Sequence, residues 1–377
     1  MWYTSVVMRK HVAALAVLTV SALASSAPAL ASAEATAPTL VAGVGRAAFS
    51  GDGGAAVQAS LNRPLGAAVA ADGTVYVADT LNHRVRAVGT DGVIRTVAGN
   101  GEQNAQAEPV PVGTKGTGIA LGSPNAVAVG ADGTVFIADS SVSQVYALAA
   151  DGTITSRVTG DLLGGPIATI NSLAVTSAGT LYLADRENSR IVEIAAGDRA
   201  RPVSTPVPLP TGLAADATGA VWISSATSQL SRLQDGKVAT IVGSPNDGWT
   251  ADEKRPVASP FGATAVTAGK DGVYIIDNAQ RTVRRLGADG TVSTATALPA
   301  DPFGARDPVV LAMSVTTTGP LYLVDTVGSR IFSTAVAAPD SGDTADPGAV
   351  PAWPWIAAGV VAVLLAVLFM VARRRRA

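Results

Sequence analysis

Gly73-Thr-Val-Tyr-Val-Ala-Asp-Thr-Leu-Asn-His-Arg-Val-Arg-Ala-Val88 is the stretch of sequence that decides the fold. Residues 75–78 are β-branched, aromatic or small, which suits a strand in a half-buried pleated sheet. Residues 79–83 favour a turn, because short polar side chains bond to nearby backbone groups. Residues 84–88 alternate polar and apolar side chains, as in a strand with one solvated face. The stretch therefore predicts a strand, a tight turn and a second strand.

The same unit recurs five more times along the chain. In each copy an aromatic residue stands three positions before the first turn residue, which is aspartate in all copies but the fourth. Asp-Gly hairpin turns, such as Asp72-Gly73 and Asp91-Gly92, add one strand before the unit and one after it. Groups of four short strands at a period of roughly 40–50 residues predict a β-propeller. The six aromatic residues are Tyr76, Phe136, Tyr182, Trp222, Tyr274 and Tyr322.

The last repeat lacks a fourth strand. The chain meets Pro339 soon after residues 330–336, whereas residues 39–43 form an unmatched strand-like run near the N-terminus. That run resembles residues 96–99, which end the first repeat. We therefore expect an all-β, six-bladed β-propeller in which residues 39–43 lie beside residues 330–336 as the outer strand of the final blade. Closure of the ring removes sheet edges that would otherwise favour aggregation.

The N-terminal segment has the composition of a secretory signal peptide. Arg9-Lys10-His11 is basic, residues 12–24 are apolar, and Ala31-Ser32-Ala33 fits a cleavage site for small residues. Residues 1–33 are therefore predicted to be a signal peptide, and the propeller is predicted to span residues 37–338.

The C-terminal part predicts a single-pass membrane anchor. Residues 353–372 carry no charge and lie within the roughly 17–25 residues that cross a bilayer as one transmembrane helix. Four arginines follow, so residues 373–377 are predicted to be a cytoplasmic basic tail. Residues 339–352 are rich in Pro, Gly, Ser and Asp and predict a flexible linker. The propeller is thus expected outside the cytoplasm at the cell membrane. A cell-wall sorting signal is the alternative, although no Leu-Pro-x-Thr-Gly-like motif precedes the apolar run.

Composition excludes several kinds of site. The chain contains no cysteine, which rules out disulfides, thiolate metal sites and cysteine nucleophiles. Its two histidines are His11, in the predicted signal peptide, and His83, so a His-rich zinc site is excluded. Of the 27 lysines and arginines, six lie in the terminal segments, which leaves 21 against 29 aspartates and glutamates. This acidic balance argues against nucleic acid as a partner.

Two strings resemble a known repeat family. Residues 76–85, Tyr-Val-Ala-Asp-Thr-Leu-Asn-His-Arg-Val, resemble the NHL repeat consensus. The upstream insert, with Gly-Asp-Gly-Gly at 51–54 and Leu-Asn-Arg-Pro at 61–64, resembles the inserts of bacterial extracytoplasmic NHL-repeat propellers. The resemblance covers about residues 39–336 and implies a propeller fold. Relatives include sensor ectodomains, protein-binding platforms, lyases and hydrolases, so it implies no single function.

Turns in a four-stranded blade alternate between the two faces of the ring. The turn face holds the short Asp-Gly turns. The insert face holds turns such as residues 79–83 and the long inserts at 44–63, 100–123, 244–261 and 299–309. Because long loops are uncommon unless they are functional, we expect a ligand or partner site on the insert face, around the mouth of the axial channel. The candidate contacts are Asp52, Arg63, Asn82, His83, Trp249, Phe261, Phe303 and Arg306.

The repeated aspartates could be interpreted as a ring of metal ligands. A structural role is the better interpretation, because a carboxylate at the end of a strand accepts backbone N–H bonds within the turn. The five structural turn residues are Asp79, Asp139, Asp185, Asp277 and Asp325.

Two classes of function follow. The preferred hypothesis is a membrane-anchored binding module, a sensor or scaffold that takes an unknown protein or small ligand at the cell surface and needs neither a catalytic residue nor a cofactor. The alternative is a calcium-dependent, gluconolactonase-like hydrolase or lyase that uses the axial channel. Resemblance to such propellers implies carboxylate and amide ligands there, and Asn125 and Asn171 leave that alternative open.

Overall fold

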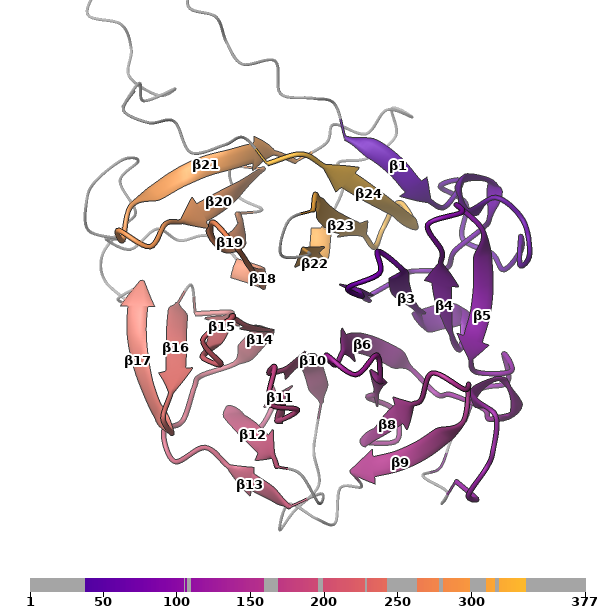
Figure 1. Cartoon of the computed structure of the whole chain (residues 1–377), viewed down its shortest axis with the longest axis horizontal. Helices are drawn as coiled ribbons and strands as arrows, with labels where there is room; N and C mark the ends of the chain where they lie inside the picture. Colours follow the sequence, from indigo (N-terminus) through magenta and orange to yellow (C-terminus); the bar gives the residue numbers. More distant parts are fainter. Residues whose placement is uncertain are drawn as a thin grey trace, which may run out of the picture. The chain divides into compact units, whose positions relative to one another are not determined.

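The computed structural model describes residues 38–104, 106, 110–158, 169–195, 199–227, 229–242, 263–277, 281–298, 310–315 and 319–336. These residues form 24 strands and three short 3-10 helices. The strands assort into six four-stranded antiparallel sheets around a central axis (Figure 1). The inner strands contact one another in the closed cycle β2-β6-β10-β14-β18-β22. The predicted six-bladed propeller is therefore confirmed.

Each blade takes its strands in sequence order from the axis outward, and the sixth blade is completed by the first strand of the chain. Blade 1 contains β2 (Gly66–Val69), β3 (Val75–Asp79), β4 (Arg84–Val88) and β5 (Ile94–Ala98), and blade 2 contains β6 (Pro124–Val129), β7 (Val135–Asp139), β8 (Gln144–Leu148) and β9 (Ile154–Val158). Blade 3 contains β10 (Ile170–Val175), β11 (Leu181–Asp185), β12 (Arg190–Ile194) and β13 (Ala200–Pro202), and blade 4 contains β14 (Pro210–Ala215), β15 (Val221–Ser225), β16 (Leu230–Gln234) and β17 (Lys237–Val242). Blade 5 contains β18 (Ala263–Gly269), β19 (Gly272–Asp277), β20 (Thr282–Leu286) and β21 (Val292–Ala297), and blade 6 contains β22 (Val310–Val315), β23 (Leu321–Asp325), β24 (Arg330–Thr334) and β1 (Thr39–Ala42). The 3-10 helices are η1 (Ala56–Gln58), η2 (Thr80–Asn82) and η3 (Gly116–Gly118).

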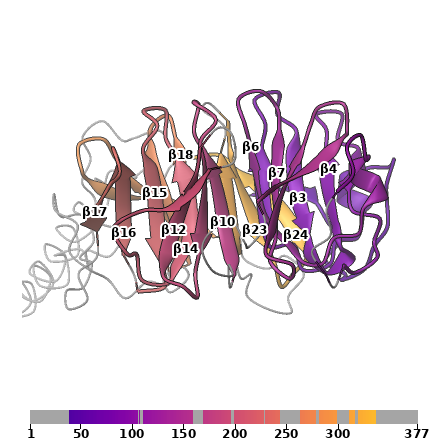
Figure 2. The same cartoon turned by 90° about the horizontal axis from the view of Figure 1, so that it is seen from below.

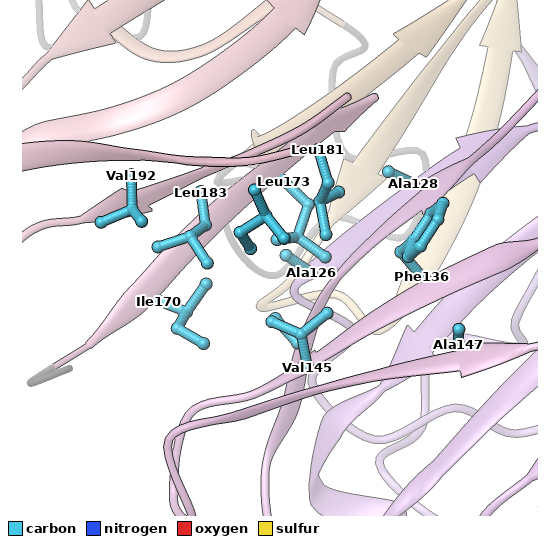
Figure 3. Close-up of a cluster of buried hydrophobic side chains, with 12 residues drawn as sticks. Ala126, Ala128, Phe136, Val145, Ala147, Ile170, Leu173, Leu181, Leu183 and Val192 are labelled. Carbon is cyan, nitrogen blue, oxygen red and sulfur yellow. The ribbon is translucent and has the colours of Figure 1, made fainter. Parts of the chain in front are cut away.

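The blades are held together by apolar side chains packed between neighbouring sheets. Six clusters of buried residues occur, one for each pair of neighbouring blades. Figure 3 shows the cluster in which Leu181 and Leu183 of blade 3 lie near Phe136 and Val145 of blade 2. Alternate side chains of one strand enter opposite clusters, as Val77 and Ala78 do. Both faces of the second strand are thus buried, which explains its nearly continuous apolar sequence.

The N-terminal strand closes the ring. β1 pairs antiparallel with β24, with Thr39 opposite Ser333 and Leu40 opposite Phe332. Gly43 follows with a φ of 93°, and a methyl group there would overlap the carbonyl oxygen of Ser329. The predicted pairing of the two ends is therefore confirmed, and it depends on a glycine at the junction.

Both ends of the described chain lie at the turn face. β24 starts after the turn at residues 325–329 on the insert face, and its far end pairs with the beginning of β1. Pro38 and Val336, the first and last described residues, are therefore at the face that holds the Asp-Gly turns. Figure 2 shows the strands running between these two faces.

No helix among the described residues is long and apolar enough to cross a membrane. The predicted signal peptide (1–33), linker (339–352), membrane helix (353–372) and basic tail (373–377) all lie outside the described residues. They remain predictions from the sequence.

Candidate functional site on the insert face and in the axial channel

The structure describes four of the eight candidate contacts. Trp249, Phe261, Phe303 and Arg306 lie outside the described residues. Asp52 and Arg63 belong to the first insert, and Asn82 and His83 belong to the turn between β3 and β4.

The first insert follows the outer edge of blade 1 rather than the mouth of the channel. The N–H of Gly53 donates to the carbonyl of Ile94 over 2.8 Å, and the N–H of Ala56 donates to the carbonyl of Gly92 over 2.9 Å. Because Gly92 belongs to an Asp-Gly turn, the insert reaches from the insert face to the turn face. Ala56, Ala59 and Leu61 are buried and fill the wedge between blades 6 and 1. The insert thus covers apolar surface and backbone groups that an outer strand leaves free.

The second insert follows the same path on blade 2. The N–H of Ile154 donates to the carbonyl of Thr114, and the N–H of Gly116 donates to the carbonyl of Gly152, each over 2.9 Å. The described parts of both inserts therefore lie along the outer edges of blades 1 and 2 rather than at the channel mouth, around which the ligand site is predicted. Neighbouring blades diverge with distance from the axis, which leaves a wedge-shaped space between their outer strands. The first insert fills such a space, so a long insert has a structural role here.

Arg86 fastens the first insert to blade 1. Its side chain is fully buried, although the alternating sequence of β4 predicts a solvated face. The guanidinium donates to the carbonyls of Ser50 and Ser60, each over 2.9 Å, and lies 2.6 Å from Oδ1 of Asp52. Burial raises the pKa of Asp52, but hydrogen bonds from Thr96 and Arg86 outweigh it, so that pKa lies below its ordinary value. Asp52 therefore holds the insert in place.

Asp79 lies beneath the insert face with no exposed surface. Its Oδ1 accepts the N–H of Asn62 over 2.7 Å, and its Oδ2 accepts Nδ2 of Asn82 over 2.8 Å. The same Nδ2 donates to the carbonyl of Ala48. Burial raises the pKa of Asp79 to about 6, against those hydrogen bonds and the charge of Arg86, whose Nη1 is 3.7 Å away. Asp79 and Asn82 thus join the turn to the insert.

The other repeated aspartates differ in which backbone groups they bind. Asp139 accepts the N–H groups of Gly122 and Ser123, in the segment that leads into its own blade. Asp325 accepts the N–H of Gly328, inside its own turn. The expected bond within the turn therefore occurs for Asp325, whereas Asp79 and Asp139 bind the incoming chain. Asp185 is paired with Arg190 and Asp277 lies 3.8 Å from Arg284.

His83 ends its turn in the left-handed conformation, with a φ of 54°. The last residue of the corresponding turn in four other blades also has a positive φ, namely Ser143, Ser189, Arg281 and Ser329. The Nδ1 of His83 donates to the carbonyl oxygen of Gly122 over 2.5 Å, and the hydroxyl of Thr80 donates to the carbonyl of Pro124 over 2.7 Å. Both bonds join blade 1 to the chain that enters blade 2. Sequence reasoning missed this role of Thr80.

The described lining of the insert-face half of the channel is narrow and uncharged. β-bulges at Asn125, Asn171 and Thr211 interrupt the inner strands, and these residues line a cavity of about 70 Å³. The Oδ1 of Asn125 is buried and has no hydrogen-bond partner among the described residues. Neither a carboxylate nor a histidine is among the described residues that line this cavity. Across the described chain, no three His, Cys, Asp or Glu side chains converge on a possible metal position.

A larger cavity lies at the opposite end of the channel. It has a volume of about 480 Å³ and is lined by the ends of the inner strands and by the turns that follow them. Four of its lining residues are valines, namely Val69, Val129, Val175 and Val315. Among the described residues, the roomier mouth of the channel is thus on the turn face, whereas the ligand site is predicted on the insert face.

Comparison with known proteins identifies the repeat type. Residues 40–117 match the family of the Teneurin NHL domain. The comparison with curated protein sequences gives no match. The matched segment and the six four-stranded blades together support the predicted NHL-repeat β-propeller.

Solved structures share the propeller fold. A structural genomics protein of unknown function from Bacteroides thetaiotaomicron VPI-5482 is 18% identical over 80% of this chain and 76% of its own, with a TM-score of 0.60. An auxiliary nutrient binding protein from the same organism is 12% identical over the same shares, with a TM-score of 0.55. A gluconolactonase from Xanthomonas campestris is 14% identical over 74% of this chain and 87% of its own, with a TM-score of 0.52. At these identities the likeness concerns the fold alone.

Proposed function

We propose that this NHL-repeat β-propeller is an extracytoplasmic binding module, a sensor or scaffold held at the cell membrane by residues 353–372. Its insert face points away from the membrane and takes a partner at the cell surface. The observation that carries the proposal is that the chain enters and leaves the propeller at the turn face, at Pro38 and Val336.

The position of the ends orients the propeller. A 14-residue linker of the composition of residues 339–352 has a root-mean-square span of about 20 Å as a flexible coil. We infer that a tether of that length favours the orientation in which the turn face lies toward the bilayer. The opposite face, which carries the turns such as residues 79–83, is then accessible to proteins outside the cell.

The described lining of the insert-face half of the channel supports binding rather than hydrolysis, whereas one carboxylate, that of Asp72, lines the turn-face cavity. General acid–base catalysis needs a titratable group within reach of the substrate. The described lining of the insert-face cavity offers the amides of Asn125 and Asn171 and the hydroxyl of Thr211. The buried carboxylates Asp79 and Asp325 are each engaged in hydrogen bonds within the fold.

Two measurements test the proposal. Because the chain has no cysteine, Leu81→Cys provides a single reactive thiol on the insert face. A membrane-impermeant maleimide should label this variant in intact cells, and failure to label until the cells are permeabilised would contradict the extracytoplasmic placement. Titration of the full-length chain with calcium should leave the melting temperature unchanged. A large saturable rise would favour the calcium-dependent hydrolase, since a ligand that binds only the native state raises stability.

A further inference from the structure

We propose that the insert face binds an acidic, partly apolar linear segment of a partner protein at the junction of blades 6 and 1. The binding surface, here called the 6–1 patch, consists of Val44, Arg46, Phe49, Arg63, Leu81 and Val327. The inference rests on the proposed function, because it names the partner chemistry that the outward face would recognise.

Val44, Arg63, Leu81 and Val327 lie together because the first insert passes between two turns, and Arg46 and Phe49 belong to the same insert. The N–H of Leu81 donates to the carbonyl of Asn62 over 3.1 Å on the blade 1 side. On the blade 6 side, the N–H of Arg63 donates to the hydroxyl of Ser329 over 3.2 Å. A methyl group at Gly45, beside Val44, would lie 3.7 Å from the carbonyl oxygen of Gly328, beside Val327.

Apolar side chains in the 6–1 patch remain accessible to solvent. Val44, Phe49, Leu81 and Val327 are 40%, 41%, 46% and 44% exposed. The guanidinium of Arg84 lies 3.8 Å from the centre of the Phe49 ring, so a cation–π contact holds the ring in place. An exposed apolar group with a polar rim marks an interaction site, and arginine and aromatic residues dominate the binding energy of such sites.

The free charges of the 6–1 patch are positive. Arg46 and Arg63 are exposed, and neither side chain has a hydrogen-bond or ion-pair partner among the described residues. Arg84 donates to the carbonyls of Asn82 and Asn100, not to a carboxylate. This positive surface stands on a propeller whose overall charge is negative.

The carboxylates nearest to the 6–1 patch are already engaged. Asp79 and Asp325 are buried beneath it, and Asp325 pairs with Arg330 over 2.9 Å. Asp52 is bound to Arg86 and Thr96, and the Glu102 carboxylate accepts one hydrogen bond from Nδ2 of Asn100. A partner that supplies carboxylates therefore complements the arginines of the patch.

The backbone of the 6–1 patch is fixed before binding. Arg63 has a φ of 48°, in the left-handed region, and its N–H is bonded to Ser329. Leu209 has a φ of 42° and its N–H is bonded to Ser189 in the same way, so this conformation belongs to the blade junction. It nevertheless holds the arginine in one place, and a preorganised surface loses less entropy on binding.

The acidic segment is assigned to another protein. The chain's own acidic segment contains Asp340, Asp343 and Asp346 and follows Val336, which lies at the turn face. The negative balance of the propeller disfavours nucleic acid. A second copy would bring the same arginines to the patch unless it used a different face.

Peptide binding to the full-length chain in nanodiscs tests the inference. The probes are three fluorescent 12-residue peptides that alternate Glu with Leu, Glu with Ser, or Lys with Leu, and the readout is fluorescence anisotropy. The Glu/Leu peptide should bind most tightly. Arg46→Glu with Arg63→Glu should weaken it at least about tenfold, since two desolvated charge pairs become repulsive. The matched control, Arg95→Glu with Arg201→Glu, makes the same charge change at other exposed arginines and should change affinity less than twofold.

Several results would overturn the inference. They are absent binding of the Glu/Leu peptide, equal loss in the control pair, or equal binding of the Glu/Ser peptide. Tighter peptide binding after Asp340, Asp343 and Asp346 are changed to Asn would assign the patch to the chain's own linker. Dimers that form with rising concentration and vanish in Arg46→Glu with Arg63→Glu would assign it to a second copy. If that variant still crosslinks to a cell-surface partner from residue 81, the inference fails while the proposed function stands.

Discussion

Replacing Arg86 with methionine should destabilise the propeller severely, and more so at high pH than at low pH. Methionine replaces the unbranched aliphatic stem of the side chain but removes the guanidinium and its charge. The change leaves the carbonyls of Ser50 and Ser60 without their donor and Asp79 without its nearest cation. Breaking a buried ion pair by removing one partner costs about 3–5 kcal/mol of unfolding free energy.

The pH dependence separates the loss of charge from the loss of packing. Burial raises the folded-state pKa of Asp79 to about 6, above its ordinary value of 3.8. The contribution of Asp79 to stability is therefore largest below pH 3.8 and falls as pH rises through 6. Without Arg86 the pKa of Asp79 should rise further, because that guanidinium favours the ionised form. The loss of unfolding free energy in Arg86→Met should then be greater at pH 8 than at pH 5. The difference should be about 1.4 kcal/mol for each pKa unit by which Arg86 lowers the pKa of Asp79 in the unchanged protein.

Urea unfolding of the full-length chain at pH 5 and pH 8 measures both effects. Arg84→Met is the matched control, because Arg84 is half-buried and bonds only to carbonyl groups. Its cost should be about 1 kcal/mol, and it should differ less between the two pH values than the cost of Arg86→Met, because Arg84 lowers the pKa of Asp79 less than Arg86 does. Adding Asp79→Asn to Arg86→Met should cost less than the sum of the single changes, since no charge is then buried. A cost below 1 kcal/mol for Arg86→Met, or equal costs at both pH values, would refute this account of the insert.

Three further changes test the ring. Deletion of residues 38–43 should sharply lower the melting temperature or abolish folding, because blade 6 loses β1; an unchanged melting curve would contradict closure. Gly43→Ala should cost more than about 2 kcal/mol through overlap with the Ser329 carbonyl, whereas Gly53→Ala, also at positive φ but with open space around it, should cost only about 1 kcal/mol; equal costs would show that the junction is not tightly packed. Thr80→Val should cost about 1–3 kcal/mol, because the buried carbonyl of Pro124 loses its donor; a neutral result in urea unfolding would remove this bond from the blade 1–2 junction.

The fold could be predicted because each blade is formed by one continuous stretch of sequence, so its pattern of strands and turns recurs along the chain. Each repeat shows an aromatic residue and a turn, all but the last show two Asp-Gly or similar hairpins, and the unmatched run at residues 39–43 indicates how the ring closes. The fourth strand of the third blade, β13, has only three residues and ends at Pro202, which makes it the weakest of the repeated signals.

The environment of the candidate site could not be predicted in the same way. The alternation of polar and apolar side chains in β4 predicts a solvent-exposed face. Only the path of the first insert over that face shows that Arg86 is buried. Loop length alone suggests a role at the channel mouth, whereas Ala56 and Leu61 fill a wedge whose width depends on how blades diverge. Contacts between an insert and a distant blade edge leave no periodic signal in the sequence.

Paired-site photocrosslinking in intact cells tests the central claim most directly. The chain has no cysteine, so a benzophenone maleimide can be placed on Leu81→Cys at the insert face or on Thr90→Cys at the turn face, both exposed positions. The account predicts a reproducible adduct with a cell-surface protein from position 81 and none from position 90. An adduct from position 90 alone, or equal adducts from both, would contradict an outward-facing, partner-binding insert face.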